Sequence, residues 1–421
     1  MRMKLNRSSQ LLLAAAASLL VAGMVSACAT LTVDFVYVTS AQAATGSNYG
    51  EIDVFEINSE SGRMQQIPAS PFPSGGRLPV AEAVSTDMTN LYVVNQDDNT
   101  IVQFVIGNDG KLYPVNTVNT PGIYPLAVTF SANNLFVLDL YQPLPSCSTA
   151  SPCSGSVSVL PIVTTKGTPP SEAPGTPVSN SNLTYWPLCQ YGYVSATDFT
   201  QCKAGATNDV IVPTGINVLA SGSYAYVTAY DSSVSPYTGY IFAFAVAPSS
   251  SSTPGALIPL NDGVPFAAGE QPSAVASDST GSFVYVTDYL TGKVLSYSVS
   301  SGQLTALSSA ASGNGPASIA ADPKYGYVYV ANSLDSTVTA FSVSSGNLTR
   351  LGAYTTGLQP VAIGIDPSTS HFIYTANFLG SNVSGFQLNP ADGTLLNSQF
   401  SPYSANSLPN AVAAVPHAGL L

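Results

Sequence analysis

The side chains that could carry out catalysis are few, and they lie close to one repeat of the sequence. Arg77 precedes an apolar phrase that begins at Pro79, and Glu82 is the one carboxylate within any of the seven phrases of this kind. Hydrolysis of an ester bond needs a base and a group that stabilises the developing oxyanion. Arg77 and Glu82 are therefore the candidate catalytic residues. His371 and His417 lie in a turn and in the C-terminal tail, where we expect structural or incidental roles.

A second set of polar residues stands at or just after the ends of strand-like phrases. Loops at these ends should surround one mouth of a central channel, where they could bind a polar ligand, a cation or a peptide. The alternative is that Asn and Asp side chains cap the turns through their own backbone. No loop has the spacing of a calcium site, and we expect no metal and no cofactor. The predicted rim consists of Asn95, Asp97, Asp98, Asp139, Tyr230, Asp231, Asp288, Tyr289, Asn332 and Asn377.

The rim residues end or follow a strand-like phrase that recurs seven times along the chain, as in VYVTD at 284, VYVAN at 328 and IYTAN at 373. All but the first copy follow a proline-initiated apolar phrase, and each is succeeded by an alternating run, a turn and a shorter run. Four short strands per repeat of 44 residues are typical of a β-propeller blade. The last proline phrase, at Pro409, lacks its partner, and the first copy, at 35–40, lacks its proline phrase. The sequence therefore predicts an all-β, seven-bladed propeller over 34–414, closed by pairing the C-terminal strand with the N-terminal blade.

One repeat is much longer than the others, because 88 residues separate Pro125 from Pro213. We expect a surface insertion at about 142–210; the alternative is a degenerate eighth blade, since YGYVSATD at 191 resembles YGYVYVAN at 325. Two disulfides are predicted within the insertion. The pairing Cys147–Cys153 with Cys189–Cys202 closes the shortest loops, but two other pairings and a zinc site remain open.

The N-terminus has the pattern of an export signal. A basic segment and an apolar run of 17 residues precede Val25-Ser26-Ala27-Cys28, which resembles the bacterial lipobox. We expect a signal peptide over 1–27, lipidation of Cys28, a tether over 28–33 and a tail over 415–421. Cleavage after Ala43 and an uncleaved anchor are the alternatives.

The charge of the chain argues against nucleic acid as a partner. Removal of residues 1–27 leaves 8 Lys and Arg against 23 Asp and Glu, a formal charge of −15. We expect a monomer held at the cell envelope by its N-terminal lipid.

The repeated phrases and their period resemble the lactonase family of seven-bladed propellers, which includes 6-phosphogluconolactonases, and the related YVTN surface repeats. The resemblance implies the propeller fold over 34–414. Enzymes of that family carry Arg and His just after the proline of the inner phrase. This chain departs from the pattern there, with Val80, Leu126, Thr214, Ser273, Ala317, Val361 and Asn410.

Three functions are compatible with the sequence. The first is a non-catalytic propeller that binds a small ligand or a protein on an acidic loop face. The second is a lactone hydrolase that resembles 6-phosphogluconolactonase and uses Arg77, Glu82 and backbone amides. The third is a structural component of a surface layer.

Overall fold

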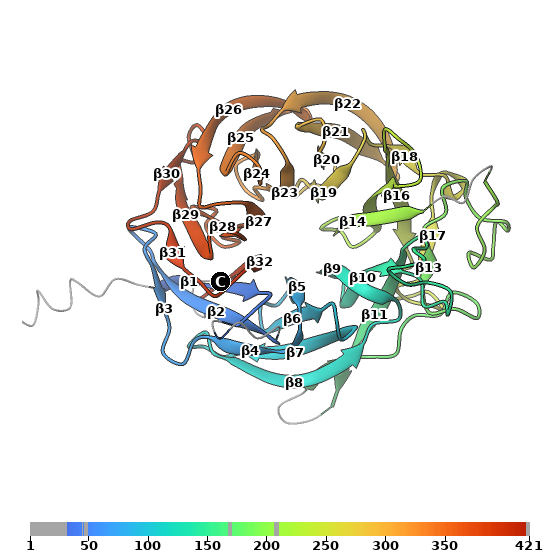
Figure 1. Ribbon diagram of the computed structural model, residues 1–421, viewed down its shortest axis with the longest axis horizontal. Helices are drawn as coiled ribbons and strands as arrows, with labels where there is room; N and C mark the ends of the chain where they lie inside the picture. Colours follow the sequence, from blue (N-terminus) through green and yellow to red (C-terminus); the bar gives the residue numbers. More distant parts are fainter. Residues whose placement is uncertain (1–31, 44, 46–48, 167–170, 206–209, 418–421) are drawn as a thin grey trace, which may run out of the picture.

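Seven small antiparallel sheets stand around a central axis, as the repeats predict (Figure 1). The computed structural model describes residues 32–43, 45, 49–166, 171–205 and 210–417. The signal peptide and Cys28 lie outside these residues. Each blade is named here by its innermost strand, except the closing blade, which contains the first and the last strand, β1 and β32. Within the described residues, no helix is long and apolar enough to cross a membrane.

The closing blade unites β32 (Pro409–Pro416) with β1 (Thr32–Ser40), β2 (Tyr49–Asn58), β3 (Met64–Gln66) and β4 (Phe72–Arg77). Val36 of β1 lies opposite Ala414 of β32 and opposite Phe55 of β2. The predicted closure of the ring is thereby confirmed.

The other six blades follow in chain order. The first two contain β5 (Pro79–Val84), β6 (Asn90–Asn95), β7 (Thr100–Ile106) and β8 (Leu112–Asn119), then β9 (Ile123–Ser131), β10 (Asn134–Tyr141), β11 (Ser156–Thr165), β12 (Ser171–Pro174) and β13 (Trp186–Pro187). The next two contain β14 (Ile211–Val218), β15 (Tyr224–Asp231), β16 (Thr238–Val246), β17 (Leu257–Pro259), η1 (Asn261–Gly263) and β18 (Phe266–Ala267), then β19 (Pro272–Ser277), β20 (Phe283–Asp288), β21 (Lys293–Ser300) and β22 (Gln303–Ala311). The last two contain β23 (Pro316–Ala321), β24 (Tyr327–Asn332), β25 (Thr337–Ser344) and β26 (Asn347–Thr355), then β27 (Pro360–Ile365), β28 (Phe372–Asn377), β29 (Asn382–Leu388), β30 (Leu395–Asn397) and β31 (Tyr403–Ser404).

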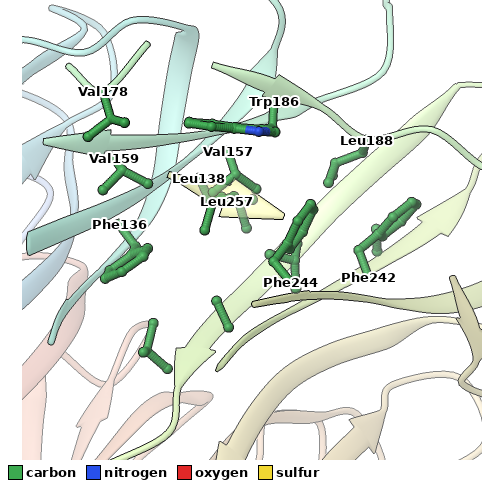
Figure 2. Close-up of a cluster of buried hydrophobic side chains, with 14 of the residues drawn as sticks. Phe136, Leu138, Val157, Val159, Val178, Trp186, Leu188, Phe242, Phe244 and Leu257 are labelled. Carbon is green, nitrogen blue, oxygen red and sulfur yellow. The ribbon is translucent and has the colours of Figure 1, made fainter. Parts of the chain in front are cut away.

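Apolar side chains between neighbouring blades form the core. Figure 2 shows one such interface, where Phe136 and Val157 of the β9 blade share a buried cluster with Phe244 and Leu257 of the β14 blade. Both faces of each sheet are covered in this way, which explains why the strands contain so many consecutive apolar residues.

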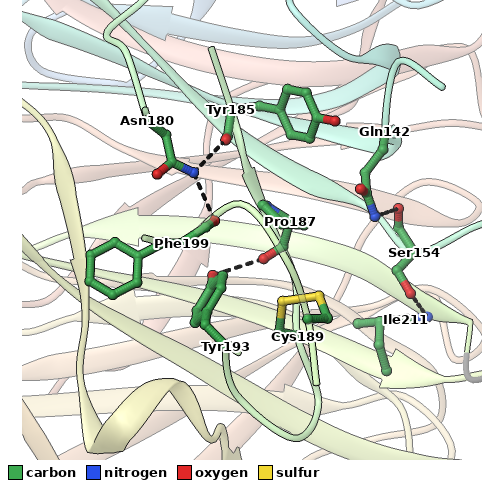
Figure 3. Close-up of a disulfide and its surroundings, with 10 residues drawn as sticks. Gln142, Ser154, Asn180, Tyr185, Pro187, Cys189, Tyr193, Phe199 and Ile211 are labelled. Atoms are coloured by element: carbon green, nitrogen blue, oxygen red, sulfur yellow. Dashed lines mark hydrogen bonds between the residues drawn. A yellow bond between two sulfur atoms is a disulfide. The ribbon is translucent and has the colours of Figure 1, made fainter. Parts of the chain in front are cut away.

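The long repeat completes the β9 blade and does not form an eighth blade. Strand β11 is the third strand of that blade, while β12 and β13 pair with its two ends as a divided fourth strand. The disulfide Cys147–Cys153 closes the loop between β10 and β11, and Cys189–Cys202 closes a loop beyond β13. Figure 3 shows that Asn180 fixes this segment by donating hydrogen bonds to the carbonyls of Tyr185 and Phe199.

The tyrosine of the recurring phrase joins each of three blades to the next one. Tyr37, Tyr226 and Tyr329 donate hydrogen bonds of 3.0 Å to the carbonyls of Gly110, Gly302 and Gly393. Each glycine has a positive φ in the turn between the third and fourth strands of the following blade. The recurring tyrosine and the Asp-Gly or Ser-Gly turn therefore form one inter-blade contact.

Replacing Tyr329 by Phe should lower the free energy of unfolding by about 1–2 kcal/mol, because the variant leaves the carbonyl of Gly393 without its donor. Urea unfolding would measure the loss. Tyr113→Phe, at an exposed tyrosine, is the control and should change little. Equal stability of both variants would contradict the proposed contribution of the contact.

Candidate functional site

The seven innermost strands form the wall around the axis. Each is the end strand of its sheet, so one of its backbone edges is left without a strand partner. Half-exposed residues recur along these strands, which indicates that solvent reaches the axis. We call the face with the loops that follow the second strands the rim face, and the opposite face the turn face. Glu82 is the only Asp, Glu, Lys, Arg or His residue in the seven innermost strands.

Glu82 occupies a register position that is aliphatic in every other blade. It lies opposite Val93 of β6, the residue two positions before the end of that strand. The residues at the same position of the other inner strands are Val128, Ile216, Val275, Ile319, Ile363 and Val412. In this one blade a carboxyl group therefore replaces an aliphatic side chain that packs against the preceding blade.

The carboxyl group of Glu82 reaches across the seam to the closing blade. Its Oε2 accepts a hydrogen bond from the hydroxyl of Thr39, while Oε1 is buried and has no hydrogen-bond partner in the described part of the chain. Burial raises the pKa of Glu82 to about 8, although the Thr39 hydroxyl and the backbone N–H of Ala413 favour the ionised form. Glu82 is therefore largely protonated at pH 7 and ionised in mildly alkaline solution.

Two further polar groups mark this seam, which we call the Glu82 seam. Asn410 of β32 donates a hydrogen bond of 3.0 Å to the carbonyl of Pro79, and the hydroxyl of Ser40 is buried without a described partner. Thr39, Ser40 and Asn410 were missed as site residues from sequence, because they come from both ends of the chain and meet Glu82 only when the ring closes. The unpaired Pro409 phrase was the one signal that β32 lies here.

Arg77 stands at the rim face and is engaged by Asp98. Its Nε and its backbone N–H each donate a hydrogen bond of 2.7 Å to the Asp98 carboxylate, and its Nη2 lies 2.6 Å from Oδ1. Partial burial opposes ionisation of Asp98, but the hydrogen bonds and charge of Arg77 hold its pKa below the usual value. No described contact joins Arg77 to Glu82. The structure therefore does not bring the two candidate residues together as a pair.

Most of the predicted rim residues are buried within their own blades. Asn332 accepts from Ser312 and donates to Thr337 and Thr339. Asn377 donates to Asn382 and Ser384 in the same manner. These contacts are made to other side chains and not to the backbone of a turn. The buried members of the predicted rim are Asn95, Asp139, Asp231, Asp288, Asn332 and Asn377.

The buried carboxylates among them have donors of their own. Asp288 accepts the backbone N–H groups of Glu270 and Gln271, and Asp231 accepts both the N–H and the hydroxyl of Ser233. Burial raises the pKa of Asp139 to about 7, although Ser158 and the N–H of Gly122 favour its ionised form. These three carboxylates do not form an acidic surface.

Only a few predicted rim residues remain accessible. Asp97 is exposed, and Tyr230 and Tyr289 are half-buried. Tyr230 packs against Tyr237 with 5.0 Å between ring centroids. His371 stacks against Tyr325, and the ring of His417 packs at a tilt against Phe35. Among the described residues, no group of three His, Cys, Asp or Glu side chains is placed to hold a metal ion.

The comparisons with known proteins agree with this architecture. Residues 303–413 match the family model described as "Lactonase, 7-bladed beta-propeller". The resemblance to lactonase propellers is confirmed. The curated proteins contain no match to this chain.

Solved structures show the same lactonase-type propeller over nearly the whole chain. A putative 6-phosphogluconolactonase from Bacteroides fragilis is 20% identical, with a TM-score of 0.68, and the alignment covers 92% of this chain and 99% of that one. A periplasmic gluconolactonase from Pseudomonas aeruginosa is 19% identical, with a TM-score of 0.67, and covers 91% and 99%. At these identities the likeness establishes the seven-bladed propeller fold alone. The two disulfides of this chain indicate an exported protein, because disulfides form in oxidising compartments.

Proposed function

We propose that this protein is an exported hydrolase of uncharged lactones and that Glu82 is its general base. The observation that carries the proposal is the position of Glu82, where the other six blades have valine or isoleucine. A half-buried carboxyl group with an unpartnered oxygen lowers the stability of the fold. Carboxyl groups in such unfavourable environments are often found at functional sites. The lactonase-type fold supports the same reaction class.

The proposed step uses only groups at the Glu82 seam and a water molecule. The ionised carboxylate takes a proton from water while the water oxygen bonds to the lactone carbonyl carbon. Backbone N–H groups on the free edges of the inner strands can stabilise the oxyanion. The bond to the ring oxygen then breaks, and that oxygen receives the proton from Glu82, which restores the carboxylate.

The charge of the wall favours an uncharged substrate. The seven innermost strands carry no Lys, Arg or His, and Arg77 at the rim is already paired with Asp98. An anionic phosphate near Glu82 would meet no cation and would be repelled by the ionised carboxylate. Sugar lactones without a phosphate group therefore fit this wall better than phosphorylated ones.

Location at the cell envelope is part of the proposal. Cys28 stands four residues before Thr32, the first residue of β1. A lipid on Cys28 would hold the propeller close to a membrane with its turn face nearest, because β1 begins on that face. Labelling with a radioactive fatty acid should mark the protein, and Cys28→Ser should remove the label.

The test is hydrolysis of glucono-δ-lactone, galactono-lactone and dihydrocoumarin by the mature protein, followed as acid release in a pH-stat. Glu82→Gln should lower kcat/KM by about 100-fold. Because the base must be ionised, kcat/KM should rise with pH and level off above about 8. Glu60→Gln, at an exposed glutamate, is the control. Absence of turnover on all three lactones, or full activity of Glu82→Gln, would reject the proposal.

A second candidate function is a binding module, and a separate surface favours it. Leu290, Leu334, Leu358 and Leu379 are each more than half exposed. They lie in loops of the rim face on three consecutive blades, and partners often cover exposed apolar side chains that gather on one face. If no lactone is hydrolysed, capture of partners by the wild type but not by a Leu334→Ser, Leu379→Ser variant would support this function.

A further inference from the structure

We propose a second binding site, for a neutral sugar ring, on the turn face between the β19 and β23 blades. A cavity of about 390 Å³ opens there, far along the chain from the Glu82 seam. The turn between β19 and β20, the turn between β23 and β24, and the turn after β25 form its walls. The site is independent of the proposed lactone hydrolysis.

The first observation is an unsatisfied carboxylate oxygen in the wall. Asp322 is 4% exposed, and its Oδ1 accepts the backbone N–H of Lys324 at 2.8 Å. Its Oδ2 is buried and has no hydrogen-bond partner in the part of the chain that the structure describes. A buried carboxylate oxygen without a donor lowers the stability of the fold. A ligand that donates a hydrogen bond to this oxygen would remove that loss and gain affinity.

The equivalent turns of the two neighbouring blades satisfy both oxygens of their aspartate. Asp278 and Asp366 begin the same turn in the neighbouring blades. In both, one carboxylate oxygen accepts the hydroxyl two positions later, of Thr280 or Ser368, and the other oxygen accepts the backbone N–H five positions later, of Phe283 or His371. In the Asp322 turn Lys324 provides no hydroxyl, and no described hydrogen bond joins the backbone N–H of Tyr327, five positions later, to Asp322. The Asp322 turn, which lines the cavity, therefore has fewer donors to its aspartate than the equivalent turns of the neighbouring blades.

The second observation is the aromatic lining. Phe283, Tyr325 and Tyr327 are half-exposed and line the cavity. Neighbouring groups hold two of these rings in place. Tyr325 stacks on His371 at 6.4 Å with an interplanar angle of 7°, and Tyr327 donates through its hydroxyl to the carbonyl of Pro390 at 3.2 Å. Rigid rings of this kind bind without a large loss of conformational entropy.

Together these groups fit a pyranose ring better than a charged ligand. The C–H face of a sugar packs on aromatic rings, and its hydroxyls can donate to Asp322 and accept from the ammonium group of Lys324. A simple cation would be repelled by Lys324, and a simple anion by Asp322 and Asp278. A neutral polyol with one apolar face is compatible with both charges.

The experiment is titration of the mature protein with methyl β-glucopyranoside, methyl β-galactopyranoside and N-acetylglucosamine, followed by saturation-transfer NMR and isothermal calorimetry. Binding of at least one sugar is expected. Lys324→Thr restores the hydroxyl of the neighbouring repeats, so it should raise the midpoint of thermal unfolding by about 3 °C and weaken sugar binding at least about tenfold. A gain in stability with a loss of binding is not expected from damage to the fold.

Asp322→Asn is the second variant, because it keeps a side chain that can cap the turn but replaces one carboxylate oxygen. This variant should also bind the sugar at least about tenfold more weakly than the wild type. Lys293→Thr, at an exposed lysine on the rim face, is the matched control and should bind like the wild type. Benzylamine and phenylacetate serve as charged aromatic probes. The proposal is overturned if no sugar binds, if a charged probe binds while the sugars do not, or if both site variants bind like the control.

Discussion

Removal of residues 1–40 is expected to abolish cooperative folding of the propeller. The deletion takes away β1, whose central residues Val36, Tyr37 and Val38 are fully buried. Burial of a large apolar side chain contributes about 1.5–3 kcal/mol, so these three residues alone account for a large share of the stability of a typical domain. The deletion also leaves β32 and β2 without the strand that lies between them.

Near-ultraviolet circular dichroism and urea unfolding would measure the effect against a protein that begins at Cys28. The truncated chain should lose the near-ultraviolet signal and the sharp unfolding transition. Deletion of 418–421, which follow the last strand, is the control. A truncated chain that unfolds at the same urea concentration as the longer one would show that the ring does not need its closing strand.

The architecture could be predicted from sequence because each blade corresponds to one copy of a sequence repeat. A period of 44 residues with four strand-like runs predicts the order of the strands in each blade, and this prediction needs no knowledge of long-range contacts. The closure was predictable for a related reason, since the Pro409 phrase and the phrase at 35–40 each lacked the strand that the other provides. The divided fourth strand of the β9 blade was not predictable. Its pieces β12 and β13 are too short and too irregular to show a period.

The candidate site was predicted only in part, because sequence position does not give side-chain direction. Asn332 and Asn377 do end their strands, but their amides turn into the sheet and bond to neighbouring strands. Glu82 was found because a carboxylate is conspicuous in an apolar phrase. Its partner Thr39 lies 43 residues away across a seam between blades. Asp322 could not be found, because the burial of its Oδ2 without a hydrogen-bond donor is set by the folded turn and leaves no mark in the sequence.

The protein should be more stable in mildly acidic than in mildly alkaline solution. Burial is the main cause that raises the pKa of four carboxyl groups, to about 8 for Asp34 and Glu82, about 7 for Asp139 and about 6 for Asp53. The neighbouring carboxylate of Asp366 raises the pKa of Asp34 further. In the unfolded chain these groups lose their protons near pH 4. Between about pH 5 and 8 the native state therefore holds protons that the unfolded state has released.

Under these conditions the free energy of unfolding falls as the pH rises. We expect it to be at least ~3 kcal/mol lower at pH 8.5 than at pH 5, since one pKa unit corresponds to about 1.4 kcal/mol. Carboxylates with a lowered pKa, such as Asp87, Asp98 and Asp109, titrate below this window and do not change the sign. Urea unfolding at several pH values would measure the slope.

Asp34→Asn separates this explanation from a general effect of net charge. The variant keeps a side chain of similar shape and cannot titrate, so its stability should depend less on pH than that of the wild type. Asp97→Asn changes the net charge equally at an exposed position and should keep the wild-type slope. The explanation fails if both variants flatten the profile to the same extent, because repulsion among all the acidic residues would then cause the pH dependence. A flatter profile in Asp34→Asn alone would assign that part of the pH dependence to the buried pair Asp34 and Asp366, at the seam where the β27 blade meets the closing blade.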